Sequence, residues 1–213
     1  MQVGGIFIRG YKTVKHAAKS EFTEKKSVFI SHIAPVADEN EAKSFISQIK
    51  SKHPDATHNV WAYILQGTEI ARFSDDGEPS GTAGMPALEV LKREELSGVC
   101  VVITRYFGGT LLGAGGLVRA YAKGAKDAVL KAEVCEYVLF TVFNLNVSYS
   151  DSEKILRDLD KYKVRKSNIE YTDSVTLELS CPKESLDTFL DYANDLTKGK
   201  ATHNIVGERF EGI

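Results

Sequence analysis

Apolar residues in the first 137 positions fall into short runs with the composition of strands, separated by segments of helical periodicity. Residues 27–36 are mostly apolar and β-branched, which predicts a strand. After it, Asp38 and Glu41 have the spacing of a capping box, and apolar residues recur at helical intervals up to Pro54. The expected elements are a strand over 27–36, a helix from Asp38 to before Pro54, a hairpin of strands over 59–66 and 69–74, a short helix over 86–95 beginning at Pro86, a strand over 98–106 that is buried on both faces, and a helix over 116–132.

The remaining residues follow a different order of elements. They predict a strand over 138–149, a helix over 151–162, strands over 164–172 and 174–181, a helix opened by Pro182 and a last strand near 201–210. This βαββαβ order is typical of the ferredoxin-like fold. The sequence therefore predicts an α+β protein with two domains, 1–137 and 138–213.

Composition and charge exclude several classes of protein. The 213 residues include 27 Lys and Arg against 29 Asp and Glu, a net charge of −2, so a strongly basic nucleic-acid surface is absent from the chain as a whole. Residues 1–137 carry 17 basic and 16 acidic side chains, whereas 138–213 carry 10 and 13. Three scattered cysteines, no long apolar run and no signal-peptide pattern lead us to expect a cytoplasmic protein that does not contact membranes.

A glycine-rich run between a predicted strand and a predicted helix is the first candidate for chemistry. Glycines permit positive φ angles and let backbone N–H groups converge at the start of a helix, where an anion is favoured. Neither a dinucleotide-binding nor a P-loop motif fits, because Val118 replaces the last glycine of the first and Ala114 replaces the lysine of the second. The alternative is a tight crossover in which the glycines serve packing alone. The glycines are Gly108, Gly109, Gly113, Gly115 and Gly116.

Asp75, Asp76 and Glu78 form an acidic cluster before a predicted helix. Their oxygens suit a hard cation or a general base, but a solvated turn with a capping hydroxyl from Ser80 or Thr82 fits the pattern better. The five histidines have no metal-ligand spacing, so we expect no metal and no cofactor.

Single polar side chains near these motifs complete the candidate site. Arg105 ends an apolar strand, so its charge needs a carboxylate partner inside the protein or an anionic ligand outside it. Tyr106 and Phe107 offer stacking surfaces for a base, or belong to the core. Arg119 lies one turn into the following helix, and His58 is either a general base or an ordinary loop residue.

Longer motifs then show a resemblance to a known family. Residues 105–109 and 112–121, preceded by GluProSerGlyThrAlaGlyMetPro at 78–86 and AspAlaThrHisAsn at 55–59, resemble the IMPACT/YigZ family, in its bacterial two-domain form. The resemblance implies an N-terminal domain with the fold of the second domain of a small-subunit ribosomal protein. It also implies a C-terminal domain similar to the last domain of elongation factor G. Eukaryotic members of the family regulate translation.

Three functional hypotheses follow. The first is a regulator linked to translation or stress, which binds an anionic ligand (RNA, a nucleotide or a ribosomal or translation-factor partner) in a cleft between residues 74–84 and 105–116. The second is an enzyme that acts on a phosphorylated or carboxylated small molecule through Asp75, Asp76 or Glu78. The third is a protein-interaction module whose glycines serve packing alone, with Arg105 paired inside.

Overall fold

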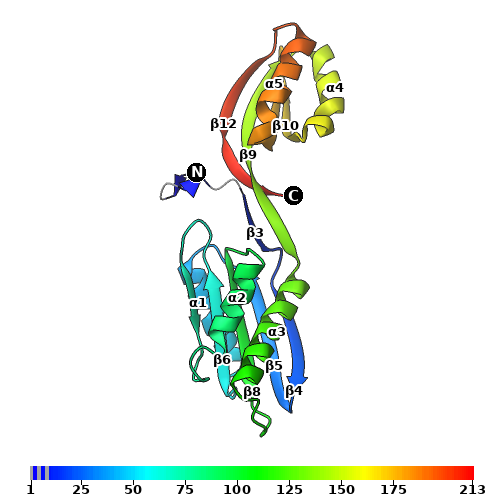
Figure 1. Ribbon diagram of the computed structural model, residues 1–213. Coiled ribbons are helices and arrows are strands. Elements are labelled where there is room, and N and C mark those ends of the chain that lie inside the picture. The colour runs from blue at the N-terminus through cyan, green and yellow to red at the C-terminus, as the bar shows by residue number, and fades with distance from the viewer. Residues whose placement is uncertain (1, 4–5, 8–9) are drawn as a thin grey trace. The chain divides into compact units, whose positions relative to one another are not determined.

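The structure, a computed structural model, describes residues 2–3, 6–7 and 10–213, which divide into two compact units. The N-terminal unit spans Gln2–Glu136 and the C-terminal unit spans Tyr137–Ile213 (Figure 1). Each combines an antiparallel sheet with helices, and the described residues contain five α-helices. The α+β class predicted from the sequence is therefore confirmed.

The N-terminal unit is built on a five-stranded sheet with β8 at its centre. Every neighbouring pair in this sheet is antiparallel. Seven of the eight β8 residues are buried, as its apolar composition predicts. The strands, in the spatial order β4-β5-β8-β6-β7, are β4 (Ala18–Glu24), β5 (Ser27–Pro35), β8 (Val99–Tyr106), β6 (His58–Ile64) and β7 (Ala71–Ser74).

Helices cover both faces of this sheet. Side chains alternate between the two faces along each strand, so β8 supplies two separate cores. Ile103 packs on one face with Tyr121, under α2 (Gly84–Arg93) and α3 (Ala114–Ala132), which lie next to each other (Figure 1). Val102 packs on the other face with Ile49 of α1 (Glu39–Lys52).

The starts of α1 and α2 can be compared with the starts that the sequence predicts. The side chain of Asp38 accepts hydrogen bonds from the Asn40 and Glu41 amides, which confirms the predicted N-cap of α1. The prediction for α2 was two residues late, because α2 begins at Gly84 rather than at Pro86. A proline is tolerated anywhere in the first turn, where backbone N–H groups have no partner within the helix.

Four strands before residue 25 were not predicted. These are β1 (Gln2–Val3), paired antiparallel with β2 (Ile6–Phe7), then β3 (Gly10–Val14) and the edge strand β4. β4 escaped prediction because most of its residues are polar or charged and only Phe22 is a large apolar residue.

The C-terminal unit has the predicted βαββαβ order, with strands arranged as β10-β11-β9-β12. Its core contains Phe143, Leu177 and Phe189. No helix among the described residues is both long and apolar enough to cross a bilayer. The elements are β9 (Val134–Val147), α4 (Tyr149–Asp158), a 3₁₀ helix (Leu159–Tyr162), β10 (Arg165–Tyr171), β11 (Val175–Pro182), α5 (Lys183–Thr197) and β12 (Thr202–Gly212).

Candidate functional site

Three residues that the sequence analysis selected from separate segments converge in the N-terminal unit. Arg105 Nη1 donates to Glu78 Oε1 over 2.7 Å, and His58 Nε2 lies 3.8 Å from the same oxygen. His58 and Arg105 are paired residues on β6 and β8, and Glu78 comes from the loop after β7. The sheet therefore brings the three motifs to one place.

Tyr121 joins this cluster, a role that was not predicted from the sequence. Its hydroxyl donates to Glu78 Oε1 over 2.7 Å, and its ring packs edge-on against Phe29. Burial, followed by the bond to Glu78, raises the pKa of Tyr121 well above its usual range, so the hydroxyl stays protonated. The helical spacing of α3 correctly places Tyr121 toward the core, but it carries no signal for the partner of the hydroxyl.

Arg105 lies inside the protein, with 5% of its surface exposed. Its guanidinium sits 5.5 Å from the Phe29 ring centroid and 5.4 Å from that of Phe107, and Nη2 donates to Ser27 Oγ over 3.3 Å. Arg105 Nε is buried and has no hydrogen-bond partner among the described residues. Of the two environments that the sequence allowed for Arg105, the structure has the internal ion pair.

The three acidic residues have separate partners. Asp75 accepts hydrogen bonds from the amides of Gly81, Ala83 and Gly84, so it caps α2. Asp76 accepts from Lys50 Nζ and from the Asn59 amide, each over 2.7 Å. Burial opposes the ionisation of Asp76, but these two donors outweigh it and lower its pKa.

This separation bears on the alternative in which the acidic cluster holds a cation or supplies a general base. Within the described ranges, no group of three or more His, Cys, Asp or Glu side chains is placed to hold a metal ion. Thr82 Oγ1 donates to the Pro79 carbonyl over 2.6 Å, and Ser80 is exposed in the same loop. The loop over 74–84 thus has the properties of a turn closed on itself, with Asp75 rather than a hydroxyl as the capping group.

His58 has a fixed orientation beside Glu78. Its Nδ1 lies 2.9 Å from the Asp76 carbonyl oxygen. A carbonyl can only accept, so Nδ1 carries the hydrogen and Nε2 faces the Glu78 carboxylate. The neighbouring residue Thr57 accepts a hydrogen bond from the Phe107 amide through Oγ1, over 3.1 Å.

The glycine-rich loop between β8 and α3 is tied down at its beginning. Gly108 N donates to Ser27 Oγ over 3.2 Å, and its Cα packs directly against the Lys26 backbone. The amides of Phe107 and Gly108 therefore both donate hydrogen bonds to side chains of the protein. Further along, Gly109 and Gly113 have positive φ angles of 79° and 75°, and Leu111 is 81% exposed.

The start of α3 leaves its backbone donors open. Gly113 is the N-cap residue and supplies no side chain to cap the helix. Ala114 and Gly115 are exposed, and Gly116 is half-buried beside Leu112. The predicted anion site thus keeps only these first-turn amides, without Arg105.

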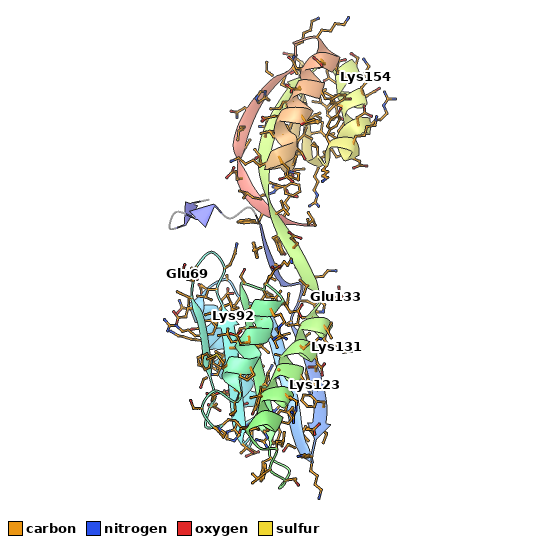
Figure 2. All side chains as sticks on the ribbon, viewed as in Figure 1. Glu69, Lys92, Lys123, Lys131, Glu133 and Lys154 are labelled. Carbon is orange, nitrogen blue, oxygen red and sulfur yellow. The ribbon has the colours of Figure 1, made fainter. Side chains whose placement is uncertain are left out.

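Gly116 and Arg119 also line a small pocket between α3 and β4, which we call the basic pocket. Its volume is about 210 Å³. Lys123, labelled in Figure 2, projects from α3. It lies over the Phe22 ring at 4.2 Å and pairs with Asp127. The basic pocket is lined by Phe22, Glu24, Lys25, Leu112, Gly116, Arg119, Ala120 and Lys123.

Tyr106 does not share a cleft with Arg105. The two residues are consecutive on β8, so their side chains point to opposite faces of the sheet. Tyr106 OH is 2.9 Å from Nδ1 of His53, the residue that ends α1, and the His53 ring lies 5.4 Å from that of His32. The prediction that Tyr106 and Arg105 serve one ligand is corrected by this alternation.

His32 makes the stability of the protein depend on pH. Burial, followed by the charges of His53, Lys19 and Lys52, lowers the pKa of His32 from 6.5 to about 4. The unfolded chain then binds the proton first, so we expect stability to fall as the pH drops from about 6.5 to about 4 and to be retained above that window. Urea unfolding across this range should show a steeper loss for the wild type than for His32→Phe. Equal slopes for the two proteins would contradict this assignment.

Comparison with known proteins places these motifs in a wider group. Residues 25–129 match the family described as "Impact N-terminal domain", and residues 145–200 match a "Domain of unknown function (DUF1949)". The chain is 40% identical over 195 residues to "IMPACT family member YvyE" of Bacillus subtilis (strain 168), covering 91% of this chain and 90% of that protein.

Two further relatives and one solved structure extend the comparison. "IMPACT family member YigZ" of Escherichia coli (strain K12) is 33% identical, covering 82% of this chain and 87% of the relative. "Protein IMPACT" of Homo sapiens is 34% identical over 95 residues, covering 43% of this chain and 30% of the relative. A structure described as "Crystal structure of an hypothetical protein" has a TM-score of 0.60 and 29% identity, covering 92% of this chain and 97% of that one.

Proposed function

The chain belongs to the IMPACT family, and on this premise we propose that it is a cytoplasmic regulator associated with translation or the stress response. In this proposal it acts by binding an anionic ligand, such as an RNA segment, at the basic pocket beside the start of α3. The family supports the regulatory part, since translation control is the role that the resemblance to its eukaryotic members implies. The proposed ligand chemistry depends on the residues of the pocket.

The observation that carries the proposal is the balance of charge at the basic pocket. Lys25, Arg119 and Lys123 line it against one carboxylate, Glu24. Lys123 has an ion-pair partner, but Lys25 and Arg119 have none among the residues that the structure describes. Unpaired cations next to open helix N–H groups favour an anion, and a phosphate satisfies both kinds of donor.

A binding measurement with one matched control tests this proposal. We expect Arg119→Glu to weaken the binding of a short fluorescent single-stranded RNA by about tenfold at about 50 mM salt, because a phosphate contact is lost and a repulsion is added. Lys131→Glu changes the charge of the same helix in its last turn, away from the basic pocket (Figure 2), and should leave the affinity within about twofold. Fluorescence anisotropy measures both variants.

Two results would contradict the proposed binding of RNA at the basic pocket. If the wild type binds no RNA at about 50 mM salt, where electrostatic attraction is strong, the proposed ligand is wrong. If Arg119→Glu and Lys131→Glu weaken binding to the same extent, the overall charge of α3 matters and the pocket does not.

A further inference from the structure

The opposite face of the same sheet carries a second and larger groove, between α1 and β6. Its volume is about 460 Å³, within the range of small-molecule sites. None of the functional motifs of the sequence analysis lies in it. We call it the Trp61 groove, and it is lined by Lys43, Ile46, Ser47, Lys50, Ser51, Trp61 and Tyr63.

Two aromatic rings form one side of the Trp61 groove. Trp61 and Tyr63 are two residues apart on β6, so they share a face of the sheet, and their rings stack at 5.6 Å with an interplanar angle of 12°. Tyr63 is buried, and its hydroxyl donates to Glu39 Oε1 over 3.0 Å. Burial, followed by this bond, raises the pKa of Tyr63. The stack is therefore held in place, while Trp61 remains half-buried at the groove.

One edge of α1 forms the other side. Lys43, Ser47 and Lys50 recur at helical spacing, so a hydroxyl lies between two ammonium groups. Both ammonium groups already have carboxylate partners: Lys43 pairs with Glu39 at 3.0 Å and Lys50 with Asp76 at 2.7 Å. Charge alone therefore gives this groove little attraction for a bare phosphate.

We propose that the Trp61 groove binds a nucleobase that carries a phosphate, either as a nucleotide or as an unpaired base of a single strand. A flat aromatic surface stacks with any base, and this contact contributes much of the affinity of single-strand sites. The Ser47 and Ser51 hydroxyls supply donors and acceptors for the base edge or the ribose. The lysines orient the phosphate by hydrogen bonds. This assignment does not depend on the basic pocket, which lies on the other face of the sheet.

Trp61 provides a direct probe, because it is the only tryptophan of the chain. Its indole N–H gives a single signal in a nitrogen-resolved NMR spectrum of the full-length protein. We expect AMP and a short oligoadenylate to shift this signal to saturation, and ribose 5-phosphate, which has the phosphate but no base, to leave it in place. A lower dissociation constant per base for the oligoadenylate assigns the site to a single strand, and equal constants assign it to a nucleotide; both results support base recognition.

A pair of matched variants separates the groove from the rest of the helix. Ser47→Glu places a carboxylate inside the groove and should weaken AMP binding at least about tenfold. Gln48→Glu adds the same charge at the next exposed position of α1, outside the groove lining, and should bind AMP like the wild type. Thermal unfolding of both variants confirms that they are folded.

Three outcomes overturn the inference. They are an indole signal that no ligand shifts, an equal shift with ribose 5-phosphate, and equal weakening by Ser47→Glu and Gln48→Glu. Arg119→Glu should leave the AMP-dependent shift unchanged, because Arg119 lines the other pocket. Arg119→Glu therefore tests the proposed ligand site at the basic pocket, and Ser47→Glu independently tests the Trp61 groove.

Discussion

Replacing Glu78 by glutamine should lower the free energy of unfolding by about 3 kcal/mol, because it leaves the Arg105 guanidinium buried without a counter-ion. The change keeps the size of the side chain and its ability to accept from Tyr121, so it tests the charge. Urea unfolding at neutral pH measures the difference. Tyr121→Phe, which removes a single hydrogen bond to the same oxygen, should cost less, about 1.5 kcal/mol.

A double-mutant cycle makes this expectation specific to the pair. If Glu78 and Arg105 stabilise the fold through each other, the combined replacement Glu78→Leu/Arg105→Leu should cost clearly less than the sum of the two single changes. Two outcomes would contradict the pairing: strictly additive losses of stability in the cycle, or a loss below about 1 kcal/mol for Glu78→Gln. Either would mean that water hydrates the Arg105 guanidinium or that another group balances its charge.

The second large effect is expected from Gly108→Ala. A methyl group there would lie 2.0 Å from both the backbone carbon and the oxygen of Lys26 and 2.5 Å from Ser27 N, so either the loop or the turn between β4 and β5 must move. We expect a loss of more than about 4 kcal/mol or a failure to fold, and thermal unfolding or the yield of soluble protein measures it.

Gly115→Ala is the matched control for Gly108→Ala. Gly115 belongs to the same glycine-rich run and sits in the first turn of α3. Apart from its chain neighbours and the backbone of its own helix, no heavy atom lies within 4 Å of the position its Cβ would occupy. Alanine forms helices more readily than glycine, so this variant should be stabilised by up to about 1 kcal/mol. If both variants lose stability alike, the glycine-rich run has a common role that close packing does not explain.

Most of the fold could be predicted because its elements carry strong local patterns. β8 is a continuous apolar run, α1 has a side-chain cap, and the C-terminal elements alternate as βαββαβ. β4 lacked such a pattern, because an edge strand exposes one side and needs few apolar residues. Its place depends on a tertiary contact, the stacking of Phe22 on Phe29 at 5.0 Å.

The sequence predicted which residues form the candidate site better than it predicted how their side chains are arranged. Tyr106 and Arg105 were predicted to serve one ligand because they belong to one sequence motif, although the alternation of side chains along β8 places them on opposite faces of the sheet. No local rule could assign Asp75 to amides six to nine residues later, or the Tyr121 hydroxyl to Glu78. The Trp61 groove was missed for the same reason, since it exists only where α1 packs beside β6.

The pairing of β9 with β12 has a consequence for synthesis of the chain. Residues 202–212 of β12 pair with residues 137–146 of β9. The first strand of the C-terminal unit therefore cannot complete its pairing until the last strand has been synthesised. The sheet of the N-terminal unit needs no residue beyond Tyr106, and its helices are complete at Ala132. The N-terminal unit can therefore fold while the ribosome is still making the second, whereas the C-terminal sheet closes only after β12 has left the exit tunnel.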